Sequence, residues 1–230
     1  MNAKQRAAKA AISFVESGMV VGLGTGSTAD FFLVALAGAV RDGRLREIRG
    51  IPTSRQSQMR AEELGIPLIE LDAANRPDIT IDGADEVDGN LNLIKGLGGA
   101  LLREKIVAQN SGKLVIIADE SKVVKMLGTK SALPVEVAVF AYAAQEEFLR
   151  SLGCAAVLRK NPAGCPFLTD NGNYILDCRF TGIADPAELQ GKLKARAGIV
   201  ETGLFLDMAE VAIIGSESGV REMRRSSGSR

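Results

Sequence analysis

Short apolar segments with the character of buried strands alternate with helical segments through the first half of the chain. This alternation favours a parallel sheet with helices on both faces, because the connection between two parallel strands must cross over the sheet. We therefore predict an α/β fold with a doubly wound, mostly parallel sheet. The predicted strands are 19–24, 47–53, 67–71, 77–81 and a strand within 113–122 that runs into a polar loop, and the predicted helices are 3–16, 27–40, 54–64 and 99–110.

The pattern changes after residue 130, where the segments follow the order β-α-β-β-α-β of a small α+β domain. The segment 209–215, "EVAIIG" with its flanking alanine, resembles a further buried parallel strand, and we expect a short helix after it. We therefore predict a ferredoxin-like (split βαβ) domain at 131–206, inserted into a Rossmann-like catalytic domain formed by 1–130 and 207–230. The predicted elements of the small domain are strands 134–140, 154–159, 173–180 and 199–206 and helices 142–151 and 186–196.

The composition restricts the chemistry that the chain can perform. It contains no His, so Ser-His-Asp and Cys-His triads, His-ligated zinc and imidazole acid–base catalysis are all excluded. Lys and Arg total 28 and Asp and Glu also total 28, so no net charge favours binding to nucleic acid or a membrane. Any proton transfer must therefore use Asp, Glu, Lys, Tyr or Cys.

The three cysteines are odd in number and lack paired C-x-x-C spacing, which favours buried thiols in a reducing compartment. The N-terminus has no signal-peptide pattern, and no apolar run approaches the ~18 residues that span a bilayer. We expect a cytoplasmic protein whose basic, Ser/Gly-rich tail (221–230) is frayed.

The segment "GLGTGSTAD" lies between a predicted strand and a predicted helix. It formally matches a dinucleotide fingerprint, but the next strand ends in "IPTSRQS" and lacks the acidic residue that would hold a ribose. Two interpretations remain, a tight turn capped by Ser or Thr and a phosphate-binding loop. In the second, backbone N–H groups and a helix N-terminus would bind the anion, with further donors from Ser27 and Thr28.

The segment "DGADEVDGN" places four carboxylates after the strand 77–81, before a hairpin-like element at 89–96. A calcium loop fails on spacing, because position 12 counted from Asp82 is Leu93. A magnesium site stays possible. We interpret Glu86 and Asp88 as solvated charges of a turn. Asp82 and Asp85 lie at the carboxyl edge of a parallel strand, where they could bind sugar hydroxyls or carry protons.

The helix in "KGLGGALLREKIVA" contains a candidate base. The helical neighbours of Glu104 three and four positions away are all apolar, which would desolvate its carboxylate and raise its pKa toward neutrality. The neighbours of Arg103 are equally apolar, so an ordinary surface Glu remains the alternative. Lys95 precedes the glycines and could neutralise an oxyanion. Lys4 and Lys122 could reach an anion if the strand edges converge.

Four motifs together, "GLGTGSTA", "DGADEVD", "KGLGGALLREK" and "ADESK", closely resemble ribose-5-phosphate isomerase of type A in order and spacing. "LPVEV", "TDNGNYILD", "GIVETGLF" and "EVAIIG" fit the same family, so the resemblance covers nearly the whole chain. It implies interconversion of ribose 5-phosphate and ribulose 5-phosphate through an enediol(ate), without metal or other cofactor. It also implies a homodimer or homotetramer.

The resemblance assigns roles to individual residues. Glu104 would be the base, and Asp82 and Asp85 would bind substrate oxygens and help to open the furanose ring. Lys95 and the backbone of Gly96, Leu97 and Gly98 would stabilise the oxyanion, although Leu97 interrupts what is often an unbroken glycine run. The remaining substrate-binding residues would be Thr25, Gly26, Ser27, Thr28, Gly83 and Ala84, with Lys4 and Lys122 as charge partners for phosphate.

Two rival functions belong to the same fold. A deaminase of amino-sugar phosphates is expected to use a His, which this chain lacks. A sugar-phosphate sensor module would carry an attached helix-turn-helix, and about 18 residues before the first strand are too few for one. A binding-only module without catalysis remains the alternative to the isomerase.

Overall fold

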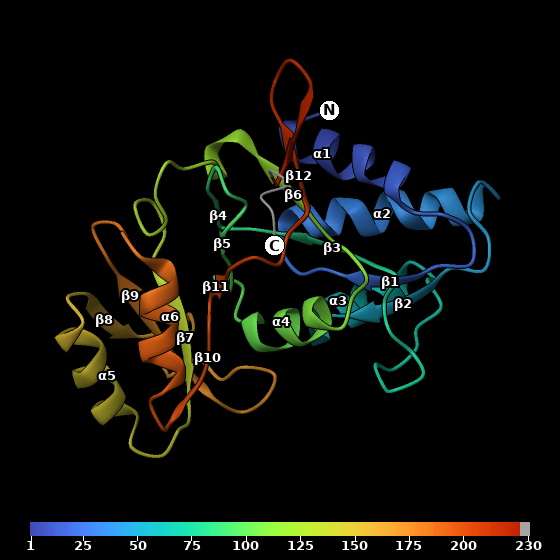
Figure 1. Ribbon diagram of the computed structural model, residues 1–230. Coiled ribbons are helices and arrows are strands. Elements are labelled where there is room, and N and C mark those ends of the chain that lie inside the picture. The colour runs from blue at the N-terminus through green and yellow to red at the C-terminus, as the bar shows by residue number, and fades with distance from the viewer. Residues whose placement is uncertain (226–230) are drawn as a thin grey trace.

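The computed structural model describes residues 1–225, and its central layer is a six-stranded sheet (Figure 1). Five strands are parallel, and the sixth, β13, is an antiparallel edge strand. This confirms the predicted doubly wound, mostly parallel fold. In spatial order the strands are β13 (Val220–Arg224), β12 (Val211–Gly215), β6 (Leu114–Asp119), β3 (Ile79–Gly83), β1 (Val20–Leu23) and β2 (Arg49–Pro52).

Helices cover both faces of this sheet. α1 (Ala3–Ala11) and α2 (Ser27–Arg41) pack on one face and α4 (Leu101–Gln109) packs on the other (Figure 1), whereas α3 (Arg55–Glu63) lies beside the edge strand β2 and against α2. The main apolar cluster lies between α1, α2 and the sheet, and a smaller one places Val107 of α4 against Val20 and Ile51. The carboxyl ends of β1, β3 and β6 therefore open onto a common edge of the sheet.

A second lobe contains a four-stranded antiparallel sheet in the order β10-β7-β9-β8, as expected for the split βαβ arrangement. The domain boundaries at 130 and 207 stay a prediction. The strands are β7 (Leu133–Val137), β8 (Ala155–Leu158), β9 (Tyr174–Arg179) and β10 (Ile199–Thr202), and the helices are α5 (Tyr142–Ser151) and α6 (Pro186–Lys194).

A three-stranded sheet joins the two lobes, in the order β11-β5-β4. Its strands are β4 (Glu86–Val87), β5 (Leu93–Ile94) and β11 (Leu204–Phe205). The prediction of one strand over 199–206 is therefore wrong, because the chain changes sheets at Gly203. A Cβ on Gly203 would lie 2.3 Å from the carbonyl oxygen of Lys95, so only glycine allows this close approach.

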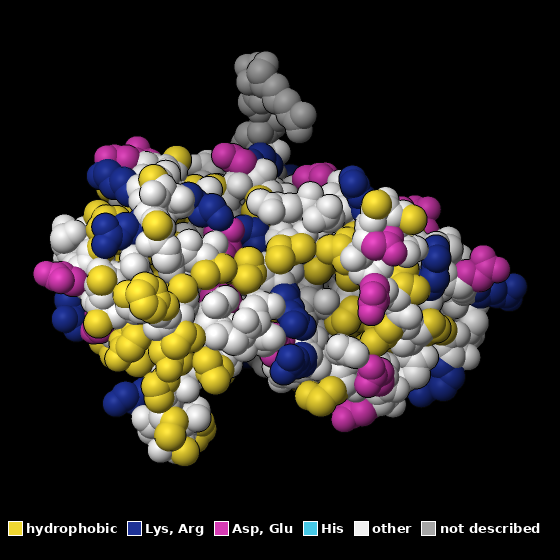
Figure 2. All heavy atoms as spheres, turned by 90° about the horizontal axis from the view of Figure 1, so that it is seen from below, with side chains coloured by type: hydrophobic (Ala, Val, Ile, Leu, Met, Phe, Trp, Pro, Cys, Tyr) yellow, Lys and Arg dark blue, Asp and Glu magenta, His cyan; other side chains and the backbone are white. Residues whose placement is uncertain are grey.

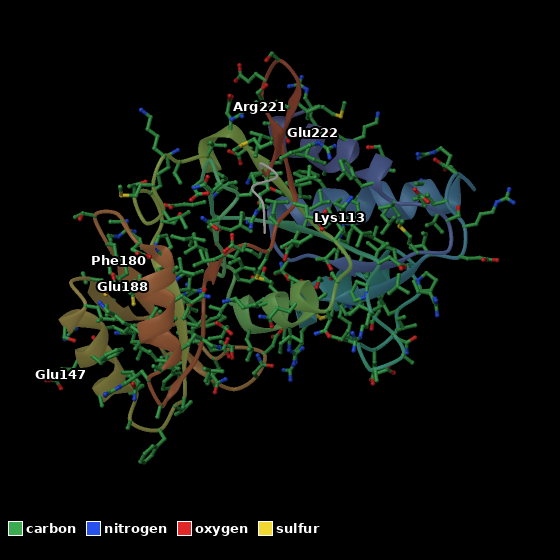
Figure 3. All side chains as sticks on the ribbon, viewed as in Figure 1. Lys113, Glu147, Phe180, Glu188, Arg221 and Glu222 are labelled. Carbon is green, nitrogen blue, oxygen red and sulfur yellow. The ribbon has the colours of Figure 1, made fainter. Side chains whose placement is uncertain are left out.

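Two further predictions are wrong. Residues 67–71 form only an isolated bridge between Leu68 and Gly50. The segment after 215 forms β13 instead of a helix, pairing with β12 from Val220↔Gly215 to Arg224↔Val211. Charged side chains on this edge strand, among them Arg221 and Glu222 in Figure 3, discourage pairing with another edge. Residues 226–230 of the tail predicted to be frayed lie outside the described residues.

Glu86 is fully buried, so its interpretation as a solvated charge is wrong. Its carboxylate accepts hydrogen bonds from three backbone N–H groups of the segment 128–131, at 2.6 Å from Gly128, 2.7 Å from Lys130 and 2.5 Å from Ser131. Asp88 is also buried, and it accepts from the N–H groups of Asn90 and Asn92 in its own turn. Two of the four clustered carboxylates are therefore structural acceptors.

No helix among residues 1–225 has the length and apolar character needed to cross a membrane.

We predict that Glu86→Gln destabilises the protein by at least about 2 kcal/mol, because the amide NH₂ group replaces an acceptor and leaves buried N–H donors unsatisfied. Urea unfolding measures the change. The control is Glu188→Gln on the outer surface of α6 (Figure 3), where an exposed carboxylate pairs with Lys192. Loss of this pair should lower the free energy of unfolding by less than about 1 kcal/mol. Equal stabilities for the two variants would contradict the structural role of Glu86.

Candidate active site

The glycine-rich loop after β1 begins the site. Gly24 donates to the carbonyl oxygen of Ile81 at 3.0 Å, and a Cβ on Gly24 would lie 2.4 Å from Oδ1 of Asp82. Gly26 has φ of 104°, which favours glycine, and it caps α2. The loop therefore uses glycine where β1 and β3 approach each other and where the chain turns into the helix.

The side chain of Thr25 anchors this loop from inside. Its hydroxyl lies 2.8 Å from the hydroxyls of both Thr53 and Ser54, and its backbone N–H donates to Oδ1 of Asp82 at 3.0 Å. Thr53 and Ser54 follow β2, in the "IPTSRQS" segment that lacks an acidic residue. The hydroxyls at the end of β2 thus position the loop after β1.

Asp82 lies in β3, one residue before its carboxyl end, and Asp85 follows the strand, and the two occupy different environments. Asp82 is only 1% exposed, and its Oδ1 accepts from the N–H groups of Thr25 and, at 2.7 Å, Gly83. Asp85 is partly exposed, and its Oδ2 accepts from the N–H group of Leu97 at 3.0 Å. Asp82 therefore forms the floor of the site, whereas Asp85 forms part of its wall.

The ammonium of Lys95, which is 2% exposed, connects the acidic segment to α4. Its Nζ lies 3.0 Å from Oδ2 of Asp82 and 3.2 Å from Oε1 of Glu104, and it donates to the carbonyl oxygen of Gly83 at 2.6 Å. Nζ also lies 5.4 Å from the centre of the buried Phe205 ring. Burial lowers the pKa of Lys95, but the carboxylates of Asp82 and Glu104 outweigh it, so the pKa lies above its ordinary value.

Glu104 lies in the first turn of α4 and is 4% exposed. Oε1 accepts from Lys95, whereas Oε2 is buried and has no hydrogen-bond partner among residues 1–225. Burial raises the pKa of Glu104 to about 8; the Lys95 ammonium lowers it in part, and the nearby carboxylates of Asp82 and Asp85 raise it further. The prediction of a desolvated carboxylate is therefore confirmed, and the alternative of a surface Glu is wrong.

Two further lysines, from other elements, contribute positive charge to the site. Lys4 on α1 donates from Nζ to the hydroxyl of Ser27 at 2.9 Å. Lys122 lies in the short 3₁₀ helix η2 (Glu120–Lys122) that follows β6. Both lysines line the same crevice as the glycine-rich loop, so the strand edges converge as the sequence predicts.

Thirteen residues line this crevice, which has a volume of about 100 Å³. All but two of the predicted site residues are among them. The exceptions are Asp82, which lies beneath Lys95, and Leu97, whose side chain is 42% exposed. The lining residues are Lys4, Thr25, Gly26, Ser27, Thr28, Gly83, Ala84, Asp85, Lys95, Gly96, Gly98, Glu104 and Lys122.

Several supporting groups escaped prediction from the sequence. Gly203 accepts from the backbone N–H of Lys95 at 2.9 Å. In the sequence, Thr53 and Ser54 served only to show that the strand before them lacks the acidic residue of a dinucleotide site. Their contact with Thr25 was not predicted. Nothing in the sequence indicates that Phe205, about a hundred residues after Lys95, packs beneath it.

The crevice joins two chemical functions. One end offers cations, hydroxyls and a helix N-terminus, which suit a phosphate group. The other end holds a desolvated carboxylate beside a buried ammonium, which suits removal of a proton next to a carbonyl group. No three His, Cys, Asp or Glu side chains among residues 1–225 form a group that could hold a metal ion.

Comparison with known proteins gives one consistent result. The family described as "Ribose 5-phosphate isomerase A (phosphoriboisomerase A)" matches residues 49–219. Ribose-5-phosphate isomerase A of Roseiflexus sp. (strain RS-1) is 51% identical over 220 residues, which cover 96% of this chain and 94% of the relative.

Solved structures agree with this result. A D-ribose-5-phosphate isomerase in complex with phospho-erythronic acid superposes with a TM-score of 0.95 at 41% identity, covering 98% of this chain and 100% of the other. Ribose 5-phosphate isomerase A of Methanocaldococcus jannaschii superposes with a TM-score of 0.91 at 42% identity, covering 96% and 97% of the two chains.

We predict that Glu104→Gln stabilises the folded protein, and that the gain grows as pH rises from about 5 to about 8. The unfolded chain releases this proton near the ordinary pKa of 4.5, whereas the folded protein holds it to about 8. Over this range the free energy of unfolding of wild type falls by up to about 1.4 kcal/mol per pH unit through this group. The amide variant cannot ionise at this position and does not undergo this loss.

Urea unfolding of wild type and Glu104→Gln across this pH range measures the difference, in which the titration of other groups cancels. Glu188→Gln, which replaces an exposed carboxylate paired with Lys192, is the control, and its stability should differ from that of wild type by less than about 1 kcal/mol at each pH. A pH-independent difference for Glu104→Gln would mean that Glu104 ionises at its ordinary pKa.

Proposed function

Because this chain belongs to the ribose 5-phosphate isomerase A family, we propose that the crevice around Glu104 is its active site. The chain is an aldose–ketose isomerase that interconverts D-ribose 5-phosphate and D-ribulose 5-phosphate. The observation that carries the assignment of the site is the unpartnered, buried Oε2 of Glu104 beside the Lys95 ammonium. A binding-only sensor would have no use for such a costly arrangement.

In this proposal, Glu104 moves the proton. Oε2 takes the proton from C2 of the open-chain aldose, and the electron pair forms the C1–C2 double bond while O1 becomes an oxyanion. A proton then passes from O2 to O1, and Glu104 returns its own proton to C1. A base with a pKa of about 8 suits this cycle, because it must both accept and release a proton near neutral pH.

Lys95 stabilises the negative charge that develops on the substrate oxygen. Its ammonium is already desolvated and held in place, so little reorganisation is needed during the reaction. The backbone N–H groups of Gly96 and Gly98 have no acceptor among residues 1–225 and can add hydrogen bonds. The N–H of Leu97 is occupied by Asp85, which leaves it less suited to the oxyanion than its neighbours.

Asp85 lines the crevice and binds substrate hydroxyls, and together with Asp82 it assists the opening of the furanose ring. Asp82 acts from beneath Lys95, whose ammonium it contacts. At the far end, Ser27, Thr28 and the N-terminus of α2 bind the phosphate group, with Lys4 and Lys122 as its charge partners. The two ends of the substrate thus meet the two chemical functions of the crevice.

We further propose that the protein acts in the cytoplasm, in the non-oxidative branch of the pentose phosphate pathway, as a homodimer or homotetramer. Three free cysteines support a reducing compartment, although only Cys154 and Cys178 are buried as the sequence predicts and Cys165 is exposed. Apolar side chains gather over the small lobe in Figure 2, and the exposed Phe140, Val157 and Leu168 belong to this part of the chain. Such a surface favours association with another protein surface.

We predict that Glu104→Gln lowers kcat by at least about 10²-fold, because the amide cannot accept the C2 proton. A coupled assay of ribulose 5-phosphate formation measures the rate, with a chelator present throughout. Wild type should remain active with the chelator. Inhibition by phospho-erythronic acid, the ligand of a related structure, should persist in assays of the variant's residual activity, because the phosphate end is unchanged.

Near-normal turnover of Glu104→Gln would remove Glu104 as the base. Loss of wild-type activity on addition of the chelator would instead favour a cation bound by the acidic segment.

A further inference from the structure

We propose that Arg159, in the small lobe, is a positioning residue for the isomerase reaction, because it holds the loop that carries Lys95. This inference rests on the proposed role of that loop in stabilising the oxyanion. Arg159 follows β8, more than sixty residues after Lys95, and it is not among the residues that line the crevice. Its side chain nevertheless reaches the backbone next to Lys95.

One nitrogen of the Arg159 guanidinium binds two consecutive carbonyl groups of the loop. Nη1 donates to the carbonyl oxygens of Gly96 and Leu97, both at 3.0 Å. Both carbonyls belong to the loop 96–98, in which Gly96 and Gly98 line the crevice. Because each peptide unit is planar, fixing its carbonyl oxygen on one side also fixes the direction of the following N–H group on the other. The guanidinium therefore aims the N–H groups of Leu97 and Gly98.

Asp177 fixes the guanidinium in turn. On β9, its Oδ2 accepts from Nε of Arg159 at 2.8 Å, and its Oδ1 pairs with Nη2. The side chain of Arg159 is only 12% exposed. A bidentate pair of this kind fixes both the position and the plane of the guanidinium, which a lysine could not do.

The segment between β8 and β9 supports the same loop at two further points. The ring of Phe167 packs against Gly99, where a Cβ would lie 2.5 Å from the ring, and its centre lies 5.8 Å from the Arg159 guanidinium. Farther along, Asn171 accepts from Nε of Arg103 at 3.0 Å. Arg103 immediately precedes Glu104 in α4, so the small lobe contacts both the loop after Lys95 and the side chain next to Glu104.

The expected effect of losing Arg159 lies in kcat. The loop positions Lys95 and the N–H donors that act on developing charge, whereas the phosphate group binds at the other end of the crevice. An interaction used only in the transition state changes kcat and leaves KM nearly constant. A displacement of about 1 Å in such a site can lower the rate by up to about 10²-fold.

The test compares Arg159→Met with wild type in steady-state kinetics. We expect kcat to fall at least about tenfold, with KM changed less than about threefold. Asp177→Asn should also lower kcat, and Arg159→Met/Asp177→Asn should be no slower than Arg159→Met alone, because Asp177 acts through Arg159. The matched control is Arg179→Met, on the same strand as Asp177, which exchanges an exposed arginine and should leave kcat unchanged.

A second measurement separates positioning from a general loss of folded protein. Guanidinium ion added to Arg159→Ala, far below denaturing concentrations, should raise its kcat several-fold and should not raise that of Arg179→Ala. A kcat of Arg159→Met within about twofold of wild type, or a loss confined to KM, would overturn the proposal. So would failure of guanidinium to raise kcat of Arg159→Ala. If wild type itself showed no isomerase activity, the proposed function would fail instead.

Discussion

A single buried ammonium determines how this site is built. Lys95 lies between the carboxylates of Asp82 and Glu104, almost without contact with water. The single positive charge of Lys95 cannot neutralise two buried carboxylates at once, which favours the protonated form of a carboxyl group in this cluster. Glu104 holds its proton more tightly than an ordinary carboxylic acid, because it is buried, lies near the carboxylates of Asp82 and Asp85, and has an Oε2 without a partner among the described residues.

The fold supplies this cluster from three separate elements. Asp82 lies near the carboxyl end of β3, Lys95 follows β5, and Glu104 lies in the first turn of α4. Gly24 and Gly203 allow neighbouring backbones to approach where any side chain would clash. The small lobe also supports this cluster, because its β8–β9 segment forms hydrogen bonds with the loop after Lys95 and with the start of α4. The catalytic cluster therefore depends on packing between the two lobes.

The sequence predicts the parts of the site that depend on local pattern. The glycine loop, the edge position of Asp82 and the apolar neighbours of Glu104 all follow from spacing along the chain. Glu86 shows where such reasoning ends, because its three N–H partners lie about forty residues away and only the folded chain brings them to the carboxylate. The change of sheet at Gly203 has the same origin, since the close approach that requires glycine there involves the carbonyl oxygen of Lys95, about a hundred residues earlier in the chain. Arg159 looks like an ordinary charged residue after a strand until its contacts with Gly96 and Leu97 are known.

The pH dependence of kcat/KM for wild type tests the central claim most directly, because it reports the pKa of the base in the free enzyme. Between about pH 7 and 9 the phosphate of the substrate is already a dianion, so its titration does not interfere. With Glu104 as the base and its pKa at about 8, kcat/KM should rise about tenfold over this range and level off above it. A value of kcat/KM that is constant from about pH 7 to 9 would contradict the account, because the base would then ionise like a carboxylate exposed to water.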